Sequence, residues 1–298
     1  MKTSTSKRLR WNVAIWLAAG LFMTSTAGMA AGPIMPDPKA EARHQPQVEE
    51  TANGIPLVNI TAPSSGGVSR NEYETFNVPD KGAILNNSYT LSKTELAGYV
   101  QGNNNMAERP AKIIVNEVTG AGSTSMDGFL EVAGNRADVV IANPNGITVN
   151  GGGFINTGKA FLTTGKPVYD GEDHLQRFDI TGGDILIEGK GLGGKETGSL
   201  AILSRAVKIN AGIWAKDLHI TTGANTVDAK TLEASAIEGK GERPAFALDT
   251  AAIGGMYAGR ITLVGTEKGL GVNNSGTWSA EDNLTLDWNG DLKNSGTI

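Results

Sequence analysis

The chain has 298 residues, of which 39% are apolar and 19% charged, so it carries enough apolar content to build a core. It contains 40 glycines without the strict period of collagen, and no cysteine, which excludes disulfide scaffolds, thiolate metal sites and cysteine nucleophiles. The formal net charge of −5 excludes a general nucleic-acid binder, because the chain has no excess of cations to neutralise phosphates.

Residues 1–30 have the pattern of a secretory signal peptide. Four basic side chains come first, an uncharged apolar run of 11 residues follows at 13–23, and Gly28 and Ala30 supply the small residues that a signal peptidase requires. We predict cleavage between Ala30 and Ala31. A membrane anchor is the alternative, but the apolar run is much shorter than the roughly 20 residues that a spanning helix needs.

The next segment, residues 31–52, carries prolines and mixed charge and has little to bury. This composition predicts a flexible leader.

Short β-type runs dominate the chain after residue 53. No window keeps apolar residues at helical spacing for two turns without a Gly, Asn or Pro. Eight runs of three or four residues are mostly flanked by Gly, Asn or Asp: 113–115, 129–132, 139–141, 185–187, 207–209, 218–220, 261–264 and 284–286. Strands of this length suit a solenoid better than a sandwich, because each coil of a solenoid contributes several short strands stacked in parallel.

Similar segments return at a nearly constant spacing of 20 to 23 residues. The repeats are Ile187 with Ile209, Leu263 with Leu286, and 274–278 with 294–298. A period near 20 is typical of one coil of a β-helix. We expect Val, Ile and Leu to stack inside the coils, and asparagines at equivalent corners to hydrogen-bond from coil to coil.

Two longer stretches, residues 57–88 and 129–165, resemble the N-terminal secretion domain of two-partner secretion exoproteins. This family includes filamentous haemagglutinins, large haemolysins and contact-dependent inhibition toxins. The resemblance implies an all-β fold, a right-handed parallel β-helix with an N-terminal β-cap. It places the secretion domain at residues 53–265 and the start of a haemagglutinin-type repeat shaft at 266–298.

The resemblance also implies a function in export and not in catalysis. A dedicated outer-membrane transporter would recognise the chain in the periplasm through its soluble domains. The expected route is Sec followed by the outer membrane, and the expected destination is the surface or the medium of a Gram-negative-type bacterium.

Two asparagine motifs of this family have counterparts here, and they are the candidate recognition residues. The first is intact as Asn-Pro-Asn-Gly, whereas the second, Asn-Pro-Asn-Leu in the family, lacks its proline and leucine. The residues are Asn143, Pro144, Asn145 and Gly146 in the first, and Asn103, Asn104, Asn105 and Met106 in the second. In the first, Pro144 presets φ for a tight turn, and the Asn143 side chain is expected to bond its own downstream backbone. Two interpretations of these motifs stay open: they contact the transporter, or they are purely structural turns.

No residue pattern predicts a catalytic site, a cofactor or a metal. The glycine-rich segment 189–194 follows a β run, but no helix opens after it, so we interpret it as a turn and not as a dinucleotide site. Three scattered histidines do not make a zinc site, and 287–291 departs from the spacing of a calcium loop. The pair formed by Asn116 and Glu117 is expected to face solvent.

Two alternatives from other classes stay open. A domain that itself binds host surfaces or glycans predicts binding by the purified chain without a transporter. A glycan-active β-helix enzyme predicts carboxylates clustered in a groove. Because residue 298 ends on a repeat without a polar cap, we also expect the sequence to be a fragment or the product of a disrupted gene.

Overall fold

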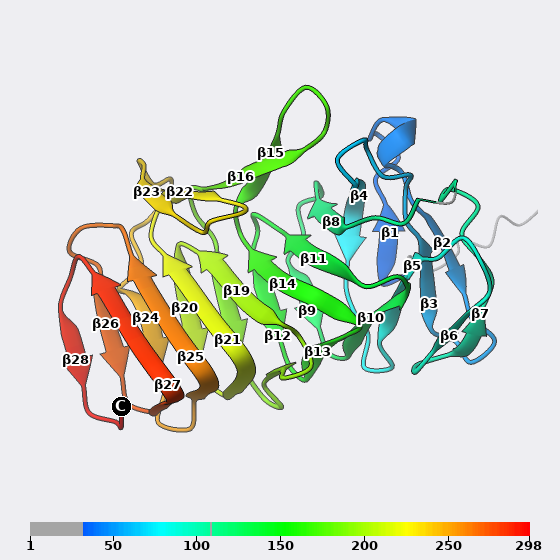
Figure 1. Ribbon diagram of the computed structural model, residues 1–298. Coiled ribbons are helices and arrows are strands. Elements are labelled where there is room, and N and C mark those ends of the chain that lie inside the picture. Colours follow the sequence, from blue (N-terminus) through cyan, green and yellow to red (C-terminus); the bar gives the residue numbers. More distant parts are fainter. Residues whose placement is uncertain (1–31, 108) are drawn as a thin grey trace, which may run out of the picture. The chain divides into compact units, whose positions relative to one another are not determined.

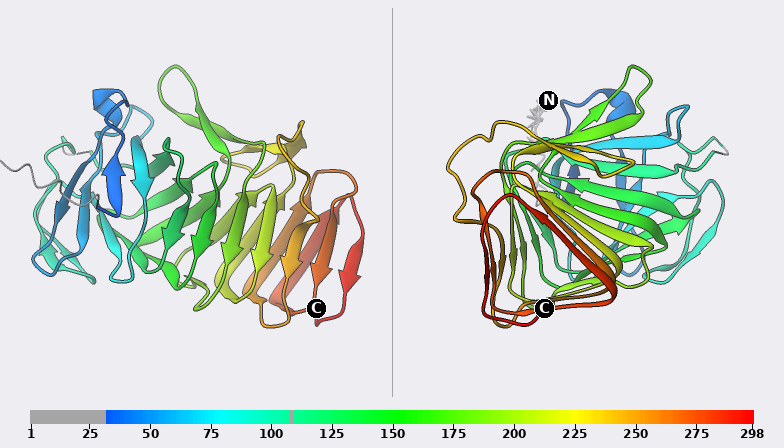
Figure 2. Two further views of the ribbon diagram at one scale, coloured as in Figure 1. Left: turned by 180° about the vertical axis from the view of Figure 1, so that it is seen from behind. Right: turned by 60° about the vertical axis from the view of Figure 1, so that its left-hand side comes forward.

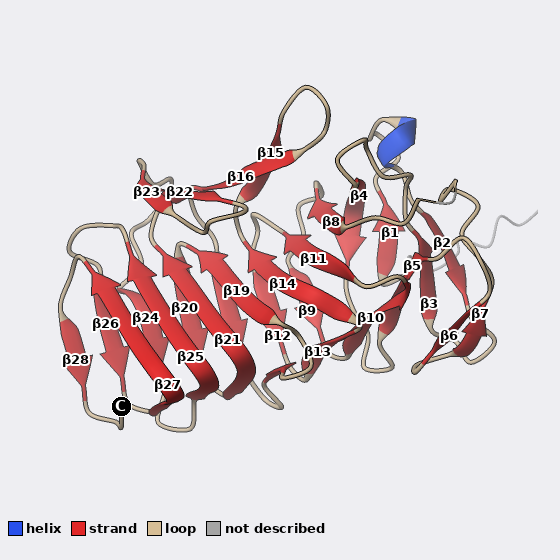
Figure 3. Ribbon diagram, in the orientation of Figure 1, coloured by secondary structure: helices blue, strands red, loops and turns tan. Residues whose placement is uncertain are grey.

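The computed structural model describes residues 32–107 and 109–298. This part of the chain consists of strands, turns and loops, apart from the three-residue 3-10 helix η1 (Ala42–His44) (Figures 1 and 3). No helix within it is long and apolar enough to cross a membrane. The predicted all-β fold is confirmed over these residues.

Most strands wind into a right-handed parallel β-helix with three faces (Figure 2). Each complete coil visits face 2, then face 1, then face 3. Face 1 contains β4 (Val68–Phe76), β8 (Ile113–Val118), β11 (Ala137–Ala142), β14 (Thr157–Thr163) and β19 (Ser199–Ser204). Face 2 contains β2 (Gln47–Glu50), β3 (Pro56–Asn59), β5 (Ala83–Asn87), β10 (Phe129–Gly134), β13 (Gly152–Ile155) and β18 (Leu192–Gly194). Face 3 contains β9 (Thr124–Met126), β12 (Ile147–Val149), β17 (Asp184–Ile187), β20 (Ala206–Ile209), β24 (Phe246–Thr250), β26 (Gly271–Asn274) and β28 (Leu292–Asn294).

Three long strands bend around the corner between faces 2 and 1: β21 (Gly212–Thr222), β25 (Gly255–Gly265) and β27 (Thr277–Trp288). The first half of β21 pairs with β18 and its second half pairs with β19. The sequence predicted strands of only three or four residues here, and that prediction is wrong. At this corner Lys216 and Asp217 stay within the strand, where the shorter strands are separated by turns.

The predicted period is confirmed by the strand register. Ile187 lies opposite Ile209, and Leu263 lies opposite Leu286. Asn274 lies opposite Asn294, and its Nδ2 donates to the Asn294 Oδ1 at 2.9 Å. Aliphatic side chains from all three faces meet inside the coils and form one continuous core. The asparagine ladder satisfies corner amides from coil to coil, as expected.

The N-terminal cap includes the residues predicted to be a flexible leader, and this prediction is wrong for residues 34–50. Strand β1 (Ile34–Pro36) pairs antiparallel with β4, and β2 pairs antiparallel with β3. Ile34 is buried opposite Phe76, so the segment has an apolar anchor that its polar composition concealed. The hairpin of β6 (Ser92–Thr94) and β7 (Gly98–Val100) completes the cap.

A separate antiparallel sheet lies outside the helix, against face 1 (Figure 2). Its strands are β15 (Lys166–Tyr169), β16 (Leu175–Ile180), β22 (Asn225–Asp228) and β23 (Ala234–Ala236). They are inserted after strands of face 1, in two different coils. A second apolar core fills the space between this sheet and face 1, and in it the rings of Phe161 and Phe178 lie 5.8 Å apart. We call residues 166–180, the β15–β16 hairpin with its loop, the strap.

Candidate functional site

The Asn-Pro-Asn-Gly motif forms a tight turn at the corner between β11 and β12. The Oδ1 of buried Asn143 accepts the backbone N–H of Asn145 at 2.9 Å, and the Asn143 carbonyl accepts the N–H of Gly146 at 3.1 Å. The Asn143 Nδ2 donates to the Gly122 carbonyl and the Thr124 Oγ1 of the preceding coil, at 2.9 and 3.0 Å. Gly146 has a φ of 109°, which glycine adopts without strain. The predicted bond from the Asn143 side chain to its downstream backbone is confirmed.

The segment 103–106 makes the same arrangement without a proline. The Asn103 Oδ1 accepts the N–H of Asn105 at 3.0 Å, and the Asn103 carbonyl accepts the N–H of Met106 at 3.1 Å. The Asn103 Nδ2 donates to the carbonyls of Ile60 and Asn86, at 2.8 and 3.0 Å. Met106 is fully buried in the core. Met106 therefore fills an apolar site at the position where the family motif has leucine.

The two turns share a design but do not form one site. They lie at different corners, and no hydrogen bond between described residues joins them. The first asparagine of each turn is buried and ties the turn to neighbouring strands, whereas Asn104, Pro144 and Asn145 are exposed. Only these three side chains are fully available to a partner. The predicted cleavage residues Ala30 and Ala31 lie outside the described part of the chain.

The strap reaches the N-terminal cap through charged contacts. Arg43 in η1 donates to the Asp173 carboxylate at 2.6 Å, although the two residues are 130 positions apart. The Ser64 Oγ donates to the Asp173 carbonyl at 3.4 Å. Next to them, His44 is buried and its Nδ1 lies 2.9 Å from Glu72. The loop of the strap thus closes over η1.

A partly buried ionic cluster lies under the strap. The Arg70 Nη2 is 2.9 Å from the Glu72 carboxylate and 3.4 Å from that of Glu117, and the guanidinium lies 4.4 Å from the centre of the Tyr169 ring. Burial raises the pKa of Glu117, although the positive charge of Arg70 opposes this shift. Burial also raises the pKa of Tyr169 well above its ordinary value. The cluster connects β4, β8 and the strap through side chains that are only partly accessible to water.

The structure corrects the prediction that Asn116 and Glu117 face solvent. Asn116 points into the coil, where its Oδ1 accepts from the Tyr73 hydroxyl at 3.0 Å and its Nδ2 donates to the Val140 carbonyl at 3.1 Å. Glu117 points to the opposite side of the strand, as alternation requires, but the strap covers that side. Both side chains are buried because both sides of β8 carry a packed layer.

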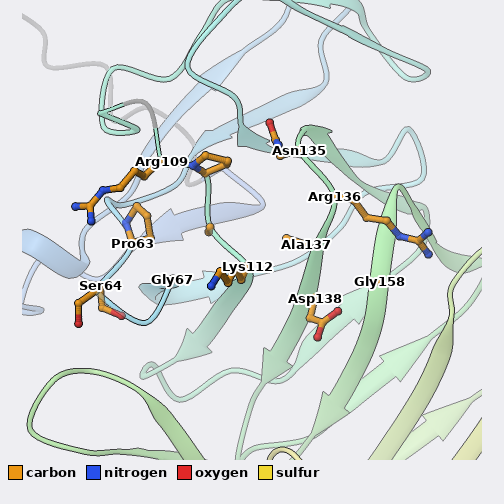
Figure 4. Close-up of a pocket in the computed structure, with 13 residues that line it drawn as sticks. Pro63, Ser64, Gly67, Arg109, Lys112, Asn135, Arg136, Ala137, Asp138 and Gly158 are labelled. Carbon is orange, nitrogen blue, oxygen red and sulfur yellow. The ribbon is translucent and has the colours of Figure 1, made fainter.

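Other sites considered from the sequence do not gather ligand groups. The segment 189–194 forms a turn that leads into β18, with positive φ at Gly189 and Gly191. Among the described residues, no group of three His, Asp or Glu side chains is arranged to hold a metal ion. A surface hollow of about 670 Å³ contains the basic residues Arg109, Lys112 and Arg136. Arg109 and Arg136 point away from each other to opposite sides (Figure 4), so the hollow does not concentrate positive charge.

A family model described as the TPS secretion domain matches residues 33–296, which is most of the chain. The chain belongs to the TPS secretion domain family. "Toxin CdiA" of Yersinia pestis is 46% identical over 272 residues, covering 90% of this chain and 8% of that protein. "16S rRNA endonuclease CdiA" of Enterobacter cloacae is 48% identical over 229 residues, covering 76% of this chain and 7% of that protein. The chain therefore spans less than a tenth of the length of these relatives.

A solved structure shares the fold of this TPS secretion domain. The crystal structure of the filamentous hemagglutinin secretion domain aligns with a TM-score of 0.76 at 29% identity, covering 90% of this chain and 99% of that one. The expected β-helix with its cap is thus shown by the structure and by its neighbour. The matched family model describes a domain for secretion, and the nuclease activity in the relatives' names is stated for those proteins.

The ionic cluster of the TPS domain was the main feature that sequence reasoning missed. Arg70 and Glu72 alternate on β4, which places them on one side of the strand, and Glu72 lies opposite Glu117 in the register. This juxtaposition of charges could be found only once β4 and β8 were known to pair. The alternation of apolar residues in the strap was the available signal for a strand pair, but it did not indicate what the hairpin covers.

Proposed function

We propose that this TPS secretion domain directs the export of a filamentous-haemagglutinin-like exoprotein by binding the periplasmic soluble domains of a cognate outer-membrane transporter. The observation that carries the proposal is the match of the TPS family over residues 33–296, together with the fold shared with the filamentous hemagglutinin secretion domain. Residues 1–30 act as the Sec signal, and the chain is then delivered to the cell surface or the medium.

The transporter engages the N-terminal region by pairing with main-chain edges. In the described part of the chain, β2 is hydrogen-bonded only to β3, and β1 only to β4, so both lie at the ends of the large sheet. The outer residues of β2 are exposed. Main-chain pairing with such an edge provides affinity without requiring a particular side-chain sequence.

Co-expression of residues 1–298 with the cognate transporter tests the proposal. We expect the chain in the medium only when the transporter is present, with the same chain and an empty vector as the control. Release without the transporter, or no release with it, contradicts the proposal. The folded state of released chain is checked by circular dichroism, which distinguishes export from leakage of unfolded protein.

Folding outside the cell makes this transport directional. Each coil that stacks on the previous one buries apolar side chains such as Ile187 and Ile209, which are fully buried. A folded coil cannot slide back, so stepwise stacking favours outward movement without a nucleotide. Ile187→Asp and Ile209→Asp are expected to slow export, and unchanged export rates in both variants would show that folding does not drive it.

The alternative function is a domain that itself binds host surfaces or glycans. It predicts that purified residues 1–298 bind cells in the absence of any transporter. The secretion assay is independent of this property, so the two functions are tested separately.

A further inference from the structure

Face 2 carries a row of outward positions that the strand register aligns along the axis of the helix. The row runs through β10, β13, β18, β21, β25 and β27, and β10, β13, β21 and β25 can be followed in this order in Figure 1. Its members are Phe129, Gly153, Gly193, Trp214, Tyr257 and Ser279. Three aromatic rings and two glycines therefore share one line across strands that are far apart in sequence.

One of the two glycines lies under an aromatic ring, and the other leaves a slot next to that ring. The Phe129 ring lies over Gly153, where a Cβ would collide with it. At Gly193 a Cβ would meet nothing closer than 3.8 Å, the distance to the edge of the Phe129 ring, so a side chain fits here in ordinary contact. Phe129 and Trp214 line the same hollow of about 320 Å³ at Gly193, and the Trp214 ring itself lies over Gly212. On the other side of Trp214, the Tyr257 ring is stacked at 6.1 Å between ring centres.

The slot is the centre of a longer groove. A hollow of about 1110 Å³ adjoins it on the side of the cap and shares Glu196, and another of about 520 Å³ adjoins it on the side of Tyr257 and shares Lys195. Phe129 and Tyr257 are 43% and 38% exposed, which is high for large apolar side chains in a packed solenoid. Lys195 and Glu196 are exposed at the hollow, and neither forms an ion pair or side-chain hydrogen bond with another described residue.

The shape and charge of the groove select its ligand. Four basic and five acidic side chains line the three hollows, so the groove is nearly neutral and does not suit a polyanion. The groove runs across strands that are hydrogen-bonded on both sides, from β10 to β25, and so it offers no free edge to an extended peptide. A chain of neutral sugar rings needs neither a charged groove nor a free strand edge. Its C–H faces stack on the electron-rich faces of aromatic rings, and its hydroxyl groups bond to polar side chains beside them.

We propose that this groove is a binding site for a neutral oligosaccharide, with one sugar ring held in the slot between Phe129 and Trp214 above Gly193. The site exists only in the folded domain, because its row is assembled from six coils. It does not depend on the transporter, so its failure would leave the proposed secretion function untouched.

Titration of the purified chain with cellohexaose and chitohexaose tests the proposal. These probes are neutral chains of sugar rings with flat apolar faces. We expect saturable binding by calorimetry and a change in tryptophan fluorescence. Because the chain has five tryptophans, the change is assigned to Trp214 by its loss in Trp214→Ala. The decisive variant is Gly193→Val, which fills the slot at a position where a side chain fits the fold. Gly193→Val and Trp214→Ala are each expected to weaken binding at least tenfold.

Tyr99→Ala is the matched control, because Tyr99 is an aromatic residue 70% exposed on the cap hairpin and outside the groove. It should leave the affinity unchanged within twofold, and circular dichroism should show that all variants are folded. Binding that survives in Gly193→Val, or binding of neither neutral probe, overturns the proposal. Binding of a heparin hexasaccharide in preference to both would overturn the assignment of a neutral ligand.

Discussion

The buried asparagine of each turn provides a sharp test of whether the motifs act as turns or as transporter contacts. In Asn143→Ala, four hydrogen bonds are lost: those from Nδ2 to Gly122 and Thr124, at 2.9 and 3.0 Å, and those that Oδ1 accepts from the N–H and the Nδ2 of Asn145, at 2.9 and 3.2 Å. At about 1 kcal/mol for each buried bond, and less where water can replace the partner at the exposed Gly122, the free energy of unfolding should fall by about 2–3 kcal/mol. Such a loss leaves most domains folded.

Two further variants distinguish a structural turn from a transporter contact. Asn145→Ala removes an exposed amide that donates to the Gly120 carbonyl at 2.8 Å, and it should lower stability by about 1 kcal/mol or less. Val272→Ala deletes a fully buried side chain on face 3 and should lower stability by about 2–3 kcal/mol, as Asn143→Ala does.

The assay compares urea unfolding with transporter-dependent release for all three variants. If the motif is a turn, release follows stability: it falls equally in Asn143→Ala and Val272→Ala and stays close to wild type in Asn145→Ala. Loss of release in Asn145→Ala at nearly unchanged stability refutes this reasoning and makes the exposed amide a transporter contact. Normal release in Val272→Ala together with loss in Asn143→Ala refutes it as well.

Three further outcomes follow from the packing. Because burial raises the pKa of Glu117, the folded chain binds its proton more readily than the unfolded chain, and stability falls as pH rises through the interval between the two pKa values. Glu117→Gln should therefore stabilise the domain near pH 7 and leave it nearly unchanged near pH 4, as measured by urea unfolding; an equal effect at both pH values contradicts the shift. Gly183→Ala should cost about 2 kcal/mol or more in the same assay, because φ is 77° and the new Cβ would lie 2.8 Å from the Pro144 carbonyl oxygen. Asn274→Ala should lower the thermal midpoint by breaking the ladder to Asn294, whereas the exposed Lys293→Ala should not.

Local chemistry was sufficient to predict the repeating part of the fold. The asparagine ladder and the turn at 143–146 follow from side chains that bond within one coil or to the next, so a 20-residue period and turn chemistry locate them. The bent strands were missed because Asp217 and Gly259 at this corner are typical turn residues, yet β21 and β25 continue through them.

Features that depend on distant segments could not be predicted in this way. The strap pairs with β22, which begins 45 residues after β16 ends, and its loop contacts Arg43 across 130 positions. Glu117 therefore had the sequence pattern of a solvated side chain, although the strap buries it. Likewise, the segment predicted to be a flexible leader is ordered by the pairing of Ile34 with Phe76. This pairing could not be recognised from either segment alone.

The contact between strap and cap sets the order in which this domain can be completed. The pairs of β1 with β4 and of β2 with β3 join residues close in sequence, but the contact of Arg43 with Asp173 forms only after the strap has emerged. Until then Arg70 and Glu117 stay hydrated, and the outer side of face 1 lies uncovered with its apolar side chains. We therefore expect the outer side of face 1 to stay uncovered until about residue 180 has left the transporter. The strands of the cap can pair before that point, and the contact of the cap with the strap is completed last.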